Sequence, residues 1–259
     1  MTKEEKNAAV SFLDLAGDYL AGGYRKNRTA DEFTDDPIRE FPSPAEPGPS
    51  ETVSAADSLE KVAADVSRCE RCGLCSTRTN TVPGEGVLRP LVMVIGEGPG
   101  ADEDASGRPF VGKAGQLLDR MLDSKGKIGL SRNKNCYIAN VVKCRPPQNR
   151  NPLPDETAAC MPFLRRQITL LKPLVILAAG NTAAKTLLDT TEGITRLRGN
   201  FTTFTLGNSD IPLLPTFHPS ALLRDESLKV PVWDDMKTLR AKLCELDAAY
   251  AELMADAPL

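Results

Sequence analysis

The sequence predicts an α/β fold in which helices cover both faces of a central, mostly parallel four-stranded sheet, giving a three-layer α/β/α sandwich. The first reason is that short apolar runs, typical of strands, alternate with longer segments that have helical spacing. The second is that residues 91–95 are apolar throughout and end at Gly96, as expected of a strand buried on both faces. Such alternation produces βαβ units and a parallel sheet.

The predicted elements follow one another in that order along the chain. A helix over residues 58–68 leads to the first cysteines, and a loop rich in glycine and proline around residue 84 precedes the first strand. The expected strands are 91–95, 136–141, 174–178, 201–205 and 211–215, and the other expected helices are 112–124, 155–171, 180–189 and 231–254.

The first 55 residues are predicted to be an N-terminal extension to a domain that spans residues 56–259. Apolar residues at helical spacing over 5–21 end at Gly22 and Gly23, which predicts a short amphipathic helix. Residues 30–50 are rich in proline and acidic side chains, a composition that favours an extended linker. Two alternatives stay open for the helix, which docks either on the main domain or on a protein partner.

Charge is distributed unevenly along the 259 residues. The formal net charge is −3, but residues 1–60 hold 6 basic and 13 acidic side chains, and residues 245–259 hold 4 acidic and no basic ones. Residues 61–244 therefore carry a net charge of +8. That excess is compatible with contacts to nucleic-acid phosphates, and it is equally compatible with a mixed, solvated surface.

No run of eighteen apolar residues is present, and the N-terminus lacks the pattern of a secretory signal, so we expect a cytoplasmic protein without a membrane span. In a reducing compartment the seven cysteines are thiols or metal ligands rather than disulfides. The spacings Cys69-x2-Cys72 and Cys144-x15-Cys160 indicate two thiolate pairs that close around one metal centre. Cys75 extends the first pair to C-x2-C-x2-C, so spacing alone leaves the choice of ligands open.

The first functional motif follows the strand at residues 91–95. Glycines at 96, 98 and 100 allow the backbone to approach a ligand closely, and Glu97 projects a carboxylate at the same place. We expect Gly98 to contact the substrate. A dinucleotide-binding loop is the alternative, but the acidic residues 102–104 would repel a pyrophosphate there.

Two further motifs offer groups that recognise a planar base. Phe110 lies in a glycine-bounded loop, where it either anchors the loop or stacks on a base removed from a duplex. Asn140 ends the strand at 136–141 and carries both a donor and an acceptor; the alternative is a core asparagine bonded to its own backbone.

His218 is the only histidine in the chain and is followed by Pro219 and Ser220 in a predicted loop. A donor held near the oxygen of a departing base stabilises charge that grows only in the transition state. Nearby, Leu222 or Leu223 is predicted to fill the gap left in a duplex, and Arg224 to contact a phosphate. Ser220 belongs to the same predicted DNA contact.

Five motifs in order resemble the family 4 uracil-DNA glycosylases over residues 61–245. They are the segment from Cys69-x2-Cys72 to Gly86, then Gly96-Glu97-Gly98-Pro99-Gly100, Gly107-Arg108-Pro109-Phe110-Val111-Gly112, Asn140-x2-Lys143-Cys144-Arg145-Pro146-Pro147 and His218-Pro219-Ser220. The resemblance implies removal of uracil from single- or double-stranded DNA in base excision repair, by a monomeric enzyme with the glycosylase fold.

By the same resemblance, Cys69, Cys72, Cys144 and Cys160 hold a structural 4Fe-4S cluster that leaves out Cys75. Phe110 stacks on uracil, Asn140 reads its polar edge and His218 stabilises the departing base. Glu97 orients water or the sugar cation, and Glu103 is a substrate-binding helper.

The resemblance also implies hydrolysis without strand cleavage, because no motif places a lysine for a Schiff base. A related branch becomes trapped on its product through an additional histidine; the chain has none, so we expect turnover. Two alternatives from other classes are an iron-sulfur module that binds DNA and senses redox state without cutting a bond, and an oxidoreductase that uses the glycine loop to bind a nucleotide.

Overall fold

The computed structural model describes residues 57–123 and 126–257. The strands are β1 (Glu85–Gly86), β2 (Val92–Gly96), β3 (Cys136–Asn140), β4 (Val175–Ala179), β5 (Thr202–Leu206) and β6 (Ser209–Thr216). The α-helices are α2 (Leu59–Ser67), α3 (Ala101–Ser106), α4 (Lys113–Asp123), α5 (Pro154–Leu171), α6 (Asn181–Leu188), α7 (Ile194–Leu197), α8 (Pro219–Arg224), α9 (Lys229–Leu246) and α10 (Ala248–Ala255). Short 3-10 helices are η1 (Gly73–Ser76), η3 (Pro147–Asn149) and η4 (Glu226–Leu228).

The sheet confirms the predicted fold class but has six strands rather than four: one edge strand, β5, corresponds to the strand expected at 201–205, and the other, β1, was not predicted. Its order is β1-β3-β2-β4-β6-β5. The four central strands β3, β2, β4 and β6 are parallel, whereas β1 and β5 pair antiparallel with their neighbours. β1 has two residues, too few for a recognisable pattern. β5 pairs with β6 through a two-residue turn whose Gly207 adopts a φ of 58°, a backbone angle that favours glycine.

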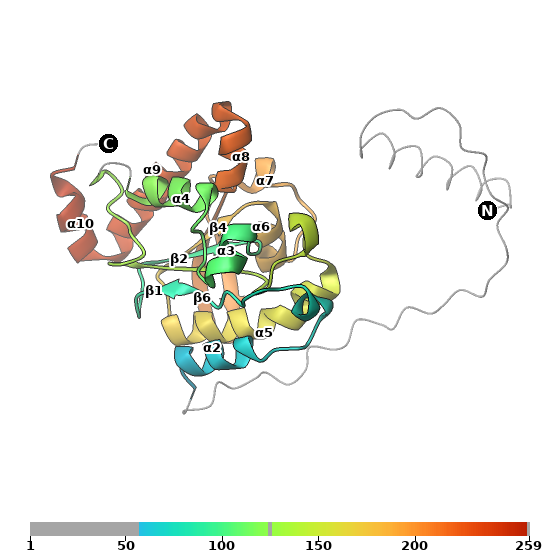
Figure 1. Ribbon diagram of the computed structural model, residues 1–259. Helices are drawn as coiled ribbons and strands as arrows, with labels where there is room; N and C mark the ends of the chain where they lie inside the picture. The colour runs from blue at the N-terminus through green and yellow to red at the C-terminus, as the bar shows by residue number, and fades with distance from the viewer. Residues whose placement is uncertain (1–56, 124–125, 258–259) are drawn as a thin grey trace, which may run out of the picture. The chain divides into compact units, whose positions relative to one another are not determined.

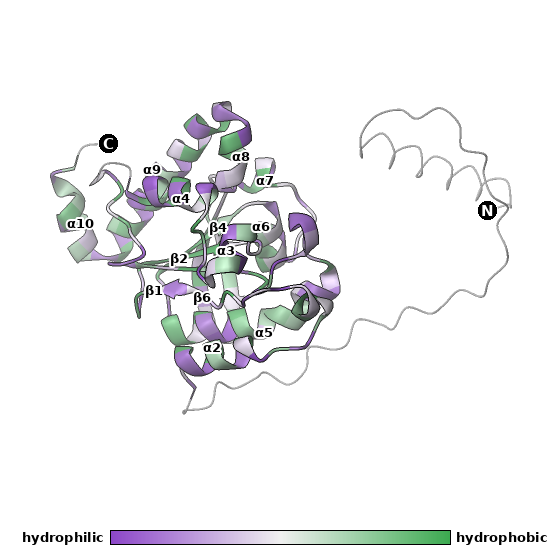
Figure 2. Ribbon diagram, viewed as in Figure 1, coloured by the Kyte–Doolittle hydropathy of each residue, from purple (hydrophilic) through white to green (hydrophobic). Residues whose placement is uncertain are grey.

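Two hydrophobic clusters, one on each face of the sheet, make the three layers. Successive side chains of a strand point to opposite faces, so Met93 and Ile95 pack with α2, α5 and α6, while Val92 and Val94 pack with α4, α8, α9 and α10. Figure 1 shows α2 and α5 on one side of the strands and α4, α9 and α10 on the other. In Figure 2 the labelled central strands β2 and β4 are largely green, which marks their apolar character, whereas the edge strand β1 is purple. All four central strands are thus covered on both faces.

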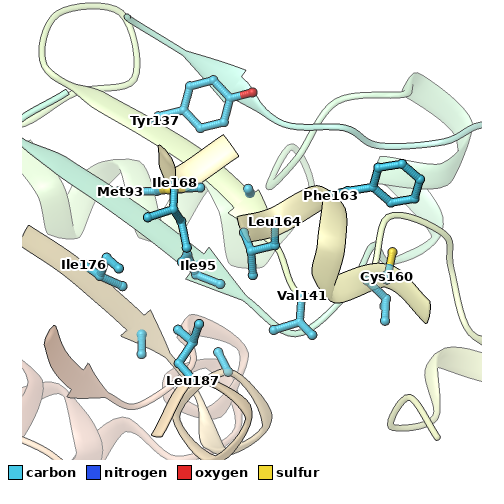
Figure 3. Close-up of a cluster of buried hydrophobic side chains, with 14 of the residues drawn as sticks. Met93, Ile95, Tyr137, Val141, Cys160, Phe163, Leu164, Ile168, Ile176 and Leu187 are labelled. Atoms are coloured by element: carbon cyan, nitrogen blue, oxygen red, sulfur yellow. The ribbon is translucent and has the colours of Figure 1, made fainter. Parts of the chain in front are cut away.

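The first of these clusters also reaches a predicted metal ligand. Figure 3 shows Leu164 and Ile168 of α5 above Ile95, with Cys160 and Phe163 farther along the same helix. One helix therefore supplies both core packing and a cysteine.

The prediction of one terminal helix over residues 231–254 is wrong. The helix α9 ends before Asp247, whose backbone is extended (φ −137°, ψ 110°). The carboxylate of Asp247 accepts a hydrogen bond from the N–H of Tyr250, 2.7 Å away. Asp247 is thus the N-cap of a new helix, a role that aspartate favours. The apolar spacing continues across the break because α10 packs on α9, and this continuity conceals it from a periodicity argument.

The predicted extension over residues 1–55, with its helix at 5–21 and its linker at 30–50, lies outside the described residues. Within the described ranges, no helix has the length and apolar character needed to cross a membrane.

Candidate active site and cysteine cavity

A cavity of about 760 Å³ opens beyond the carboxyl ends of the central strands. That edge is the usual place for ligands in parallel sheets, and the volume lies within the range of small-molecule sites. Eight of the predicted site residues line the cavity: Glu97, Gly98, Glu103, Phe110, Asn140, His218, Ser220 and Arg224. They come from segments that are far apart in sequence and meet because their strands are parallel.

The glycine loop after β2 has no side-chain volume where its neighbours need space. A Cβ on Gly96 would lie 2.5 Å from both the Phe110 ring and Oδ1 of Asn140, and a Cβ on Gly98 would lie 2.8 Å from Val142. Glycine at these positions therefore lets the aromatic ring and the amide meet over the strand end.

Glu97 is held by a residue that the sequence analysis did not identify. The hydroxyl of Thr182 donates a hydrogen bond to Oε2 of Glu97, and both residues line the cavity. Thr182 lies in the first turn of α6, directly after β4. Because β4 is another central parallel strand, residues that directly follow its carboxyl end are expected near the site. This position in the sequence could have identified Thr182 as a candidate.

Glu103 holds the Phe110 loop rather than presenting a free carboxylate. Its Oε1 accepts from the N–H groups of Val111 and Gly112 at 2.8 and 2.9 Å, and its Oε2 accepts from that of Gly100 at 3.1 Å. One carboxylate thus joins the glycine loop, at Gly100, to the two residues that follow Phe110 in the next loop.

Phe110 has a backbone conformation that needs such support. Its φ is 52°, in the left-handed region that is uncommon for bulky residues. Arg132, missed from sequence, donates to the carbonyls of Pro109 and Phe110 at 2.9 and 2.8 Å and is itself buried. The Phe110 ring lies 5.5 Å from the His218 ring, centroid to centroid, at an interplanar angle of 35°. The loop therefore aims the ring at the histidine.

Asn140 carries an unpaired acceptor. It is 2% exposed, and its Oδ1 is the one buried side-chain N or O atom, among the described residues, that lacks a hydrogen-bond partner. Buried acceptors are nearly always satisfied, because an unpaired one forfeits its hydration. The core-asparagine alternative predicts a local bond to Oδ1, and none is present. The site therefore has room for a ligand's N–H at this atom.

His218 is a neutral donor whose ring orientation is fixed. Its Nδ1 accepts from the backbone N–H of Ser220 at 3.2 Å and lies 2.8 Å from the Ser220 hydroxyl. Burial, with a smaller effect from the charge of Arg224, lowers the pKa of His218 to about 4. At pH 7 the imidazole is neutral, and because Nδ1 is an acceptor the proton resides on Nε2.

The residues predicted to contact DNA differ in exposure. Leu223 is 47% exposed and Arg224 is exposed at the cavity rim, whereas Leu222 is 2% exposed and belongs to the hydrophobic core. Leu222 is therefore not free to enter a duplex, and the prediction of an inserted side chain stays open for Leu223 alone. Ser220 lines the cavity but is engaged by His218.

The predicted metal ligands meet at a second cavity, bounded by α2, η1, the segment after β3 and α5. Cys69, Cys72, Cys144 and Cys160 all line it, and so does Cys75. Burial raises the pKa of Cys160 to about 11 and raises those of Cys72 and Cys144. Within residues 57–123 and 126–257, no three or more His, Cys, Asp or Glu side chains form a group that could hold a metal ion.

Two N–H groups point at sulfur in this cavity. Nη1 of Arg78 lies 3.3 Å from Sγ of Cys144 and also donates to the carbonyl of Cys69 at 2.7 Å. The backbone N–H of Lys143 lies 3.3 Å from Sγ of Cys160. These donors favour the thiolate form of Cys144 and Cys160.

A family model described as the uracil DNA glycosylase superfamily matches residues 83–237, which include the whole glycine loop, Phe110, Asn140 and His218. A type-4 uracil-DNA glycosylase of Sulfurisphaera tokodaii is 42% identical over 188 residues, covering 71% of this chain and 84% of the relative. The chain belongs to the type-4 uracil-DNA glycosylases. Two other type-4 enzymes agree: that of Thermotoga maritima is 48% identical and that of Archaeoglobus fulgidus 37%, covering 65% and 73% of this chain and 85% and 94% of theirs.

The sequence motifs located the groups that line each cavity. Thr182, Arg132 and Arg78 hold those groups in place, and motif reasoning gave none of the three a role.

Proposed function

We propose that this protein is a monofunctional uracil-DNA glycosylase of base excision repair, which hydrolyses the N-glycosidic bond of deoxyuridine and leaves an abasic site. The observation that carries the proposal is the unpaired Oδ1 of Asn140. This acceptor stands beside an aromatic ring and a neutral imidazole donor in one cavity. Uracil offers an N–H, a flat ring and a carbonyl oxygen to match these three groups.

Recognition follows from the chemistry of the uracil edge. Oδ1 of Asn140 accepts from N3–H of the base and the amide NH₂ donates to O4, while the extruded ring stacks on Phe110. Leu223 fills the gap in the duplex and Arg224 contacts a phosphate. The net charge of +8 on residues 61–244 is compatible with this contact with DNA.

Hydrolysis breaks the bond between C1′ of the sugar and N1 of uracil, and the base leaves with the electron pair. Nε2–H of His218 donates to O2, where the negative charge grows, and this neutral donor is available throughout the physiological pH range. Glu97, held by Thr182, orients the water that adds its oxygen to C1′ or stabilises the sugar cation. Glu103 acts through the Phe110 loop.

We also propose that Cys69, Cys72, Cys144 and Cys160 hold a 4Fe-4S cluster. Five thiols at one cavity and N–H donors to two sulfurs fit a thiolate-bound cluster. Cys69, Cys72, Cys144 and Cys160 would supply the four thiolates that such a cluster takes. Its role is structural, because no step of the hydrolysis moves an electron. Cys75 shares the cavity, so its exclusion is part of the proposal.

One experiment tests the activity. A labelled oligonucleotide with a single deoxyuridine is incubated with the protein and then treated with alkali, which breaks the strand at an abasic site. We expect a break with uracil and none with thymine at that position. Binding without any break would instead support the redox-sensing alternative and overturn the proposal.

Borohydride added during turnover tests for lyase chemistry. Lys113 lines the cavity and is the amine that would be trapped on the sugar; hydrolysis predicts no covalent adduct and no break before alkali. A monomeric state, a cytoplasmic location and a protein partner for the N-terminal helix stay predictions from sequence.

A further inference from the structure

Lys143 is a buried ammonium that lies between the two cavities. It is 1% exposed, and its Nζ donates to the backbone carbonyl of Asn140 at 2.8 Å and to Oε1 of Gln167 at 2.7 Å. In the part of the chain that the structure describes, no carboxylate forms an ion pair with it. Burying a charge without a counter-charge is costly, so a lysine at this position calls for an explanation.

The backbone of the same residue belongs to the cysteine cavity. Its N–H points at Sγ of Cys160, its carbonyl accepts from the N–H of Val82 at 2.8 Å, and Cys144 follows it directly. Lys143 therefore contacts the end of β3 through its Nζ and the cysteine cavity through its backbone N–H.

Gln167 extends the contact into a rigid frame. It is 1% exposed, lies on α5 with Cys160, and its Nε2 donates to the carbonyl of Pro83 at 2.7 Å and lies 3.5 Å from the hydroxyl of Tyr137. Lys143 therefore connects the end of β3, where Asn140 stands, to the helix that carries a cysteine. Removing its amine would leave the Asn140 carbonyl and Oε1 of Gln167 without this donor.

We propose that Lys143 is a positioning residue for uracil recognition: its contact with the backbone carbonyl fixes the backbone at Asn140 against the cysteine cavity, and so aligns the side-chain acceptor that reads N3–H. The proposal deepens the proposed function and rests on it. It differs from the idea of a cluster that only stabilises the fold, because it names one contact through which the cluster region acts on substrate selection.

A double-mutant cycle tests this coupling. K143M, N140A and the double variant are compared by single-turnover uracil release and by their binding preference for a duplex with 2′-fluoro-deoxyuridine, which resists hydrolysis, over one with thymidine. We expect K143M to lower the rate and the preference about tenfold in the native background, the scale of one lost hydrogen bond to a charged group. In the N140A background it should lower them less than twofold.

Iron content and the absorption near 400 nm are measured for every variant, and K134M, which alters an exposed lysine, is the matched control. Should K143M fail to fold or to bind iron at the native ratio, the cycle is run with K143Q, whose shorter, uncharged side chain removes the ammonium and is expected to give the same pattern of losses. Equal losses in both backgrounds would overturn the proposal. A wild type that releases no uracil would overturn the proposed function as well, so the two failures are distinguishable.

Discussion

The two cavities of this protein are built in opposite ways. The cavity at the strand ends is roomy, collects groups from the loops after β2, β3, β4 and β6, and leaves the Asn140 acceptor unpaired. The cysteine cavity is lined by five thiols, and donors already point at two of the sulfurs. The difference lies in the polar atoms: the cavity at the strand ends keeps an acceptor free for a ligand that comes and goes. In the cysteine cavity, donors from the protein already contact two of the sulfur atoms.

The strand-end cavity should show its largest rate loss with H218A. Loss of one donor to a growing oxyanion lowers the single-turnover rate by about 10²–10³-fold. The histidine also caps α8, so the thermal midpoint is measured alongside the rate. S220A keeps the imidazole and is the control, with a much smaller effect expected. Full activity of H218A on uracil-containing single strands would remove His218 from the mechanism.

The cysteine cavity is tested by C160S against C75S. We expect C160S to lose iron and the absorption near 400 nm, because the variant lacks one of the four proposed cysteine ligands. Loss of the cluster should also lower the denaturant concentration at which the protein unfolds. C75S should keep both signals, as should C244S, which alters a half-buried thiol on α9. Loss of iron in C75S together with its retention in C160S would favour the C-x2-C-x2-C assignment.

The backbone of the Phe110 loop is held by the carboxylate of Glu103. E103A removes the acceptor of three backbone N–H groups, so the loop loses its left-handed turn at Phe110 and the rate falls about tenfold. E85Q disturbs a more exposed ion pair to Arg108 of the same loop and should cost less than twofold. Similar losses in both variants would mean that the buried network does not hold the ring.

Leu223 should matter only where a duplex must be opened. L223A is expected to lower activity a few-fold on double-stranded DNA and to leave single-stranded activity unchanged, since its side chain fills a gap that single strands lack. L222A is the contrasting variant: it deletes a core side chain and should lower the free energy of unfolding by about 2–5 kcal/mol. An equal loss on both kinds of strand for L223A would count against the wedge.

The smallest expected effect is that of pH on the histidine. With a pKa of about 4, His218 stays neutral as pH falls from 8 to 5, so the single-turnover rate should show no step near 6.5 that is absent from H218A. The unfolded chain takes up a proton between pH 6.5 and 4 that the folded chain resists. The free energy of unfolding therefore decreases as pH falls below 6.5, by roughly 3 kcal/mol in total once pH is below 4. In urea unfolding, H218A should lack this part of the pH dependence.

Most elements of the fold were predictable because their patterns are local. The helix expected at 58–68 is α2, with Ser58 as its N-cap, and the strand expected at 91–95 is β2, displaced by one residue. The four parallel strands were correct because apolar runs report burial on both faces. β1 and α3 were missed because two and six residues give too little periodicity to detect, and the break at Asp247 was missed because the apolar spacing crosses it.

The sequence by itself determined the family, the chemistry of the side chains and the edge of the sheet where they gather, since these depend on residue types and on the order of strands and loops. Tertiary structure alone decided which of two adjacent leucines is exposed, which oxygen of the site is left unpaired, and that Thr182 bonds to Glu97, Arg132 to the Phe110 loop and Gln167 to Lys143. These properties are set by contacts between segments distant in the chain, and no local pattern encodes such contacts.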